Sequence, residues 1–143
     1  MEAILGKRFL VPIWQVYETP IVQGEEMTGI FTADFYNDKT GIIAGGNYLK
    51  QTQNWSNKAI TTNGGKTWNL IAENEAFGYA SCVQFVPNSK AKQLISVGGT
   101  GMFYSSDFGK SWTKFSDDKD FYTFRFESEK VFYATGRNKL VRF

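Results

Sequence analysis

Thr61-Thr62-Asn63-Gly64-Gly65-Lys66-Thr67-Trp68 is a stretch that the chain repeats as Ser105-Ser106-Asp107-Phe108-Gly109-Lys110-Ser111-Trp112. Both copies place a hydroxyl residue, Asn or Asp, Gly, Lys, a second hydroxyl residue and Trp at the same offsets. The two tryptophans are 44 positions apart, a spacing typical of repeat folds in which each repeat forms one supersecondary unit. We therefore expect a chain built from repeated units.

Each copy lies between two strand-like runs and is predicted to be a hairpin turn. The Asn or Asp side chain can accept backbone N–H hydrogen bonds and so close the turn. The glycine two positions later supplies the positive φ of a tight return, and the tryptophan begins the outgoing strand and carries a large apolar side chain between sheets. The residues given this structural role are Thr61, Asn63, Gly65, Thr67, Trp68, Ser105, Asp107, Gly109, Ser111 and Trp112.

This pattern resembles the Asp-box, or BNR repeat, S/T-x-D/N-x-G-x-T/S-W. The resemblance implies a β-propeller in which the box forms the turn between the third and the outermost strand of a blade. It also implies that the box is a folding device and does not mark an active site.

Composition indicates one ordered domain of 143 residues, with 17% aromatic and 21% charged residues. Its 16 basic and 14 acidic residues are too balanced to favour a nucleic acid or an anionic membrane as partner. No apolar run is long enough for a membrane span. Cys82 is the single cysteine and is expected to be buried, and the start of the chain lacks the apolar segment of a signal peptide. The compartment therefore stays open.

Alternating apolar residues predict an all-β chain whose strands fall into consecutive units. Trp14 stands before strand-like residues as Trp68 and Trp112 do, so residues 14–18 are expected to be a strand paired with residues 3–11. The single domain, 1–143, is divided into a partial blade at 1–19, blades at 28–72 and 79–116, and a partial blade at 121–143. In this alignment Phe35, Phe85 and Phe126 share one position, with core packing as their expected role.

These units amount to an incomplete β-propeller of about three four-stranded antiparallel blades. Propellers close with four to eight blades, and an open stack leaves apolar faces and strand edges uncovered. We therefore expect either a fragment of a longer propeller without independent function, or association with other copies through the open blade faces.

Residues 14–143 resemble the C-terminal part of a bacterial propeller family, the Ycf48-like or photosystem II stability factor-like proteins. The matching stretches include Thr28-Gly29-Ile30-Phe31, Lys58-Ala59-Ile60 before the first repeated turn, and Phe121-Tyr122-Thr123-Phe124-Arg125-Phe126. Family members are longer, so the resemblance does not extend to a function of the whole ring. They are often labelled oxidoreductases, but this sequence has no Gly-rich dinucleotide loop between a strand and a helix.

The polar loop at residues 47–57 is the best candidate for a binding surface, because loops on a rigid scaffold commonly carry recognition residues. Aromatic and amide side chains suit contacts with a protein or a glycan; those singled out are Tyr48, Gln51, Asn54 and Trp55. Arg125, on an expected innermost strand, is a candidate to line the central channel. A simple surface insertion remains the alternative for the loop.

No catalytic, metal-binding or cofactor-binding residues are predicted. The chain has no histidine, the commonest general base and a common metal ligand. A sialidase would need an arginine triad and a Tyr/Glu nucleophile pair with an acid Asp, and the four arginines do not form a recognisable set. The expected function is a non-catalytic scaffold for protein interaction or assembly, with a glycan-binding or sialidase-like glycoside hydrolase as the alternative.

Overall fold

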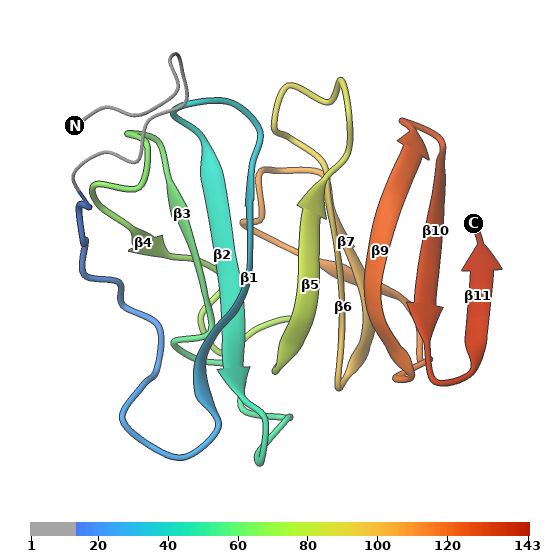
Figure 1. Ribbon diagram of the computed structural model, residues 1–143, viewed down its shortest axis with the longest axis horizontal. Helices are drawn as coiled ribbons and strands as arrows, with labels where there is room; N and C mark the ends of the chain where they lie inside the picture. The colour runs from blue at the N-terminus through green and yellow to red at the C-terminus, as the bar shows by residue number, and fades with distance from the viewer. Residues whose placement is uncertain (1–13) are drawn as a thin grey trace, which may run out of the picture.

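The computed structural model describes residues 14–143, in which eleven strands form three antiparallel sheets (Figure 1). The first sheet contains β1 (Thr28–Phe35), β2 (Gly41–Asn47), β3 (Lys58–Thr61) and β4 (Asn69–Leu70). The second contains β5 (Ala80–Phe85), β6 (Leu94–Gly98), β7 (Gly101–Ser105) and β8 (Thr113–Ser116). The third contains β9 (Phe121–Ser128), β10 (Val131–Gly136) and β11 (Lys139–Arg142). The prediction of an all-β chain is confirmed.

Strands that follow each other in sequence are neighbours in each sheet, so every sheet is a meander. The sheets stand side by side, and the chain runs through them in order from left to right in Figure 1. Their first strands contact one another, β1 with β5 and β5 with β9, whereas no such contact joins β4 and β8. The sheets therefore fan out from a common side formed by their first strands.

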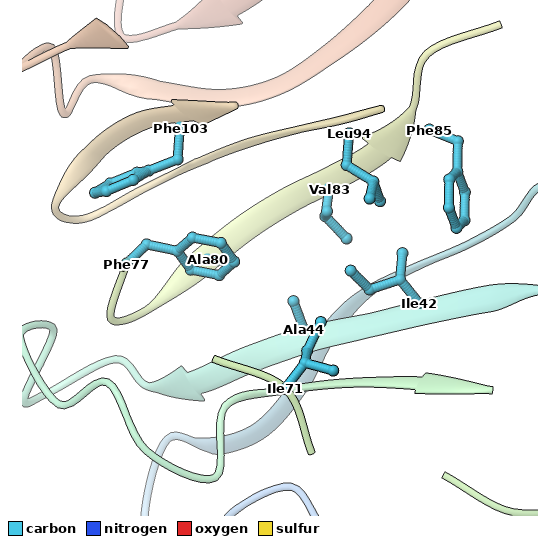
Figure 2. Packing of buried hydrophobic residues seen from close by; sticks show 9 residues of the cluster. All are labelled: Ile42, Ala44, Ile71, Phe77, Ala80, Val83, Phe85, Leu94 and Phe103. Carbon is cyan, nitrogen blue, oxygen red and sulfur yellow. The ribbon is translucent and has the colours of Figure 1, made fainter. Parts of the chain in front are cut away.

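Side chains on the second sheet alternate between two apolar cores, as the period-2 geometry of a strand requires. Val83 and Leu94 face the first sheet and pack with Ile42 and Phe77 (Figure 2). Cys82, Ile95, Val97 and Met102 face the third sheet and pack with Phe121, Phe124 and Phe132. Burying one such side chain stabilises the fold by about 1.5–3 kcal/mol. Because the second sheet buries several on each face, both cores stabilise it.

The two repeated turns have the same internal hydrogen bonds. The backbone N–H of Thr67 donates to Asn63 Oδ1 at 3.0 Å, and that of Ser111 donates to Asp107 Oδ1 at 2.9 Å. Gly65 has φ +90° and Gly109 has φ +81°. In both turns the Asn or Asp oxygen accepts a backbone N–H four residues later, and the glycine has a positive φ.

Two expectations at the N-terminal side were wrong: the strand at residues 14–18 and the core position of Phe35. Residues 14–20 have no regular secondary structure, and Trp14 is 86% exposed, so it is not equivalent to Trp68. Its expected partner strand, residues 3–11, lies outside the described residues, and a strand needs a partner for its backbone groups. Phe85 is buried, but Phe35 at the aligned position is 44% exposed, since no sheet of the described chain covers that face of the first sheet.

The outer faces of the first and third sheets are thus both open within residues 14–143. The first is partly covered by Ile21, which packs with Ile43 and Ala59. The third exposes Leu140 and the salt bridge of Arg142 with Glu127.

Candidate functional site

A cleft of about 420 Å³ lies where loops from all three sheets meet. It sits at the end of the sheets where β2, β6 and β10 finish and where β5 and β9 begin. Its lining consists of Tyr48, Gln51, Tyr79, Ser81, Gly98, Gly99, Lys119, Asp120, Phe121, Tyr122 and Arg137. The repeated turns contribute no residue to it, so the turns and the cleft are separate features of the chain.

The loop between β2 and β3 is fixed against the connector between β4 and β5. The backbone N–H of Tyr79 donates to the Gln51 carbonyl at 2.9 Å, and the N–H of Asn74 donates to the Asn54 carbonyl at 3.0 Å. A Cβ at Gly78 would lie 1.9 Å from the Gln51 carbonyl oxygen, so only glycine permits this approach. These contacts hold Gln51 and Tyr79 side by side in the cleft wall.

A glycine also lets the third sheet complete the cleft. At Gly136 a Cβ would lie 1.7 Å from the carbonyl oxygen of Asp120. The next residue, Arg137, donates its backbone N–H to that same oxygen at 3.1 Å. The turn between β10 and β11 is therefore locked to the segment that leads into β9, which brings Arg137 beside Tyr122.

Three tyrosines give the cleft both apolar surface and hydroxyl groups. The rings of Tyr48 and Tyr79 meet edge to face with centroids 5.2 Å apart. Burial raises the pKa of the Tyr79 hydroxyl, and the neighbouring Tyr48 raises it further. Tyr122 is 51% exposed, so its ring is available for contact from outside.

The charges in the cleft are mixed, with a basic excess from Lys119 and Arg137 over Asp120. The Tyr122 hydroxyl beside Arg137 raises the pKa of the guanidinium above its ordinary value, with a further contribution from the charge of Asp120. Arg137 is exposed, and a guanidinium offers a planar set of donors that suits carboxylate and carbonyl oxygens.

Only part of the predicted binding loop lines the cleft. Tyr48 and Gln51 line the cleft, whereas Asn54 and Trp55 are not among its lining residues. Trp55 is 46% exposed, and its part in binding stays a prediction. The pattern of the sequence did not predict Lys119, Tyr122 or Arg137 as site residues. The sequence did contain a signal for the position of this site, because Gly98-Gly99 and Gly136 end the second strands of their units.

Arg125 lies on β9, the first strand of its sheet, and is exposed. Its guanidinium donates to the Phe124 carbonyl at 2.7 Å and to Thr123 Oγ1 at 3.0 Å. Asp34 on β1 accepts the backbone N–H of Phe85 at 2.8 Å. Burial raises the pKa of the Asp34 carboxyl, although this hydrogen bond and the charge of Arg125 act to lower it. A channel-lining role for Arg125 stays a prediction.

Comparison with known proteins identifies the fold. No family model and no curated protein matches the chain. Among solved structures, Ycf48 bound to D1 peptide matches with a TM-score of 0.60 at 15% identity, over 88% of this chain. The three sheets are blades of a β-propeller. At this identity the likeness establishes the fold alone.

Two further propeller structures match, and both are enzymes of glycoside hydrolase family GH74. An ancestral GH74 enzyme matches with a TM-score of 0.55 at 17% identity over 85% of this chain. The GH74 xyloglucanase from Xanthomonas campestris matches with a TM-score of 0.55 at 18% identity over 83%. The chain spans 44% of the Ycf48 chain and 18% of each GH74 chain, so it corresponds to part of a propeller.

Neither a membrane-spanning helix nor a cluster of metal ligands is found within residues 14–143. No helix there is long and apolar enough to cross a membrane. No group of three or more His, Cys, Asp or Glu side chains in that part of the chain is close enough to hold a metal ion.

Proposed function

We propose that this propeller segment is a non-catalytic scaffold that binds an extended peptide of a partner protein in the cleft. The observation that carries the proposal is the meeting of Tyr48, Tyr79 and Tyr122 with Lys119 and Arg137 in one cleft built by three blades. Tyrosine and arginine are the residue types that most often dominate protein interfaces, and tyrosine gives large contact area at low entropic cost.

The backbone geometry of the site supports a rigid binding surface. Its walls are fixed by the Tyr79 N–H to Gln51 bond and the Arg137 N–H to Asp120 bond. A preformed surface loses little conformational entropy when it binds a ligand. The similar Ycf48 propeller is known with a bound peptide, which supports the same class of ligand here.

The chemistry of the lining favours binding over catalysis. Glycoside hydrolysis usually needs two carboxyl groups flanking the scissile bond, and Asp120 is the one carboxylate among the described lining residues. Ser81 Oγ, the one serine hydroxyl in that lining, donates to the Val97 carbonyl at 3.2 Å. A nucleophilic serine would instead need a neighbouring base, and the chain has no histidine.

A glycan is the second candidate ligand. The fold of this chain is also that of GH74 propellers, and the exposed ring of Tyr122 could stack on a sugar. Xyloglucan oligosaccharides are therefore the appropriate second probe.

The test selects peptides from a random library displayed on phage and measures the binding of labelled hits by fluorescence anisotropy. We expect Tyr122→Ala and Arg137→Ala each to weaken binding about tenfold or more, because interface Tyr and Arg residues are frequent hot spots. Met27→Ala and Lys130→Ala are matched controls, since both residues are exposed and neither lines the cleft.

Equal effects of the cleft variants and the controls would contradict the cleft as the binding site. Binding of xyloglucan oligosaccharides that depends on Tyr122 would replace the peptide with a glycan. Release of reducing ends from xyloglucan would contradict the non-catalytic part of the proposal.

A further inference from the structure

The third blade has an unfilled position next to an apolar pocket. Within residues 14–143 it contains three strands where the other two blades contain four, and β11 has β10 as a partner on one side only. Beside this free edge lies a pocket of about 340 Å³ between the second and third blades. The residues that line it are Ile95, Tyr104, Thr113, Phe115, Phe132 and Phe143.

The interface between the first and second blades shows which residues fill the corresponding space there. Between the first and second blades, a Cβ at Gly109 would lie 2.8 Å from Ile71 Cδ1 and 3.8 Å from Leu94 Cδ1. Trp112, three residues later, packs edge to face on Phe77, with ring centroids 4.9 Å apart. The second repeated turn and its tryptophan therefore fill this space.

The pocket lies at the corresponding place one blade later. Phe115 follows Trp112 by three residues, as Ile71 follows Trp68. Phe132 pairs with Phe126 as Leu94 pairs with Phe85. The third blade therefore presents the receiving surface for a tryptophan and an outer strand, and the described residues that follow β10 supply neither.

One segment of the chain has the pattern of such a strand and pairs with no strand among residues 14–143. Trp14-Gln15-Val16-Tyr17 matches Trp68-Asn69-Leu70-Ile71 in having Trp, a polar residue, an aliphatic residue and a further apolar residue in order. It forms no regular secondary structure, and Trp14 and Val16 are 86% and 87% exposed. Such exposure of two large apolar side chains in one short segment is typical of a surface that binds a partner.

We propose that residues 14–17 of a second copy of this chain pair with the free edge of β11 and place Trp14 in the pocket. In the complete blades Asn69 lies opposite Ile60 and Thr113 lies opposite Tyr104. The same register puts Gln15 opposite Arg142 and Val16 opposite Val141. Backbone pairing supplies affinity and the tryptophan supplies register, as in other cases of strand addition.

The strand that pairs with β11 comes from another copy, because residues 14–17 lie far from β11 in their own chain. Gln15 and Tyr17 lie beside the first repeated turn, where they share a surface hollow with Asn63 and Lys66. Ile21 is buried against the first blade. The first blade and β11 are at opposite ends of the molecule (Figure 1).

The first test measures the molar mass of the intact chain by light scattering over a range of concentrations, since self-association depends on protein concentration. We expect multimers for the parent and at least about a tenfold weaker association for Trp14→Ala. Trp14 is exposed in the single chain, so the variant should keep the near-UV circular dichroism of a folded protein. Met27→Ala is the matched control and should associate like the parent, because Met27 is an exposed apolar residue that lines neither the pocket nor the cleft.

The second test adds a labelled peptide of residues 14–19 to the Trp14→Ala variant and follows anisotropy. Binding that is lost in the peptide with Ala at position 14, and weakened by Phe115→Ala in the protein, is the expected result. A parent that is monomeric at every concentration, a Trp14→Ala variant that associates as tightly as the parent, or a peptide that does not bind would each overturn the proposal. Cleft variants such as Tyr122→Ala should leave association unchanged, so the two proposals are tested separately.

Discussion

Lys58 is a positively charged residue in an apolar environment. It is fully buried between the first and second blades. Its Nζ donates to Asn57 Oδ1 at 3.0 Å and lies 4.8 Å from the centroid of the Phe77 ring. Burial lowers the pKa of this ammonium from 10.5 to about 8, although the charges of Glu73 and Glu75 act in the opposite direction.

The lowered pKa of Lys58 predicts how stability depends on pH. Between pH 8 and 10.5 the unfolded chain binds a proton at this group that the folded chain does not, so stability rises with pH across that window. Below pH 8 the buried charge costs on the order of 3 kcal/mol, and this cost is relieved as the group loses its proton. Lys58→Met should remove this component of the pH dependence, as measured by urea unfolding from pH 7 to pH 10.5.

Lys50→Met is the control, because Lys50 is exposed. The free energy of unfolding of Lys50→Met should follow that of the parent at every pH, because this substitution changes no buried group. All three proteins contain the same tyrosines, so the titration of those groups adds the same pH dependence to each. Parallel pH profiles for the parent and Lys58→Met would contradict the lowered pKa of Lys58.

At the scale of the element, the repeated turns show how a short pattern determines backbone shape. The side-chain oxygens of Asn63 and Asp107 close their turns in the same way, although Asp107 is charged. Partial burial would raise the pKa of Asp107, but hydrogen bonds from Ser111 and Ser105 lower it overall. These contacts are local, and for that reason the turn geometry could be predicted from the sequence.

Gly109 combines two constraints that substitution can separate. Its φ of +81° disfavours any side chain, and a Cβ there would lie 2.8 Å from Ile71 Cδ1. At Gly24, φ is +97° and a Cβ would meet no atom within 4 Å. We expect Gly24→Ala to cost about 1 kcal/mol for the backbone alone.

Gly109→Ala should cost roughly 1 kcal/mol more than Gly24→Ala because it also overpacks the contact with the first blade. Chemical unfolding of both variants provides the measurement. Equal losses in the two proteins would mean that the side chain of Ile71 moves aside without cost.

At the scale of the whole molecule, the position of a blade decides how much the tryptophan of its repeated turn contributes to stability. Trp112 lies between two blades, where its indole N–H donates to the Gly109 carbonyl at 2.8 Å. Trp68 belongs to the same pattern but faces the open side of the first blade, beside the ring of Phe35. Within the described part of the chain, Trp112 therefore has a neighbouring blade and Trp68 has none.

This difference predicts unequal effects of removing the two tryptophans. Trp112→Ala should destabilise the chain by about 3 kcal/mol, near the lower end of the range for large aromatic residues in a core. Trp68→Ala should cost less by roughly 1 kcal/mol or more, because less surrounding structure is lost. Thermal or urea unfolding at low protein concentration, where association is weakest, compares them. A greater loss for Trp68→Ala would contradict the observed order of the blades.

The sequence by itself determined the all-β class, the two turns and most strand positions, because alternation, glycine placement and Asn or Asp chemistry act over a few residues. It could not place Trp14, whose strand needs a partner, or distinguish exposed Phe35 from buried Phe85. Only the tertiary structure brought Tyr79, Tyr122 and Arg137 into one cleft. Those contacts join residues from separate blades, and their geometry depends on how the sheets fan out, which no local pattern encodes.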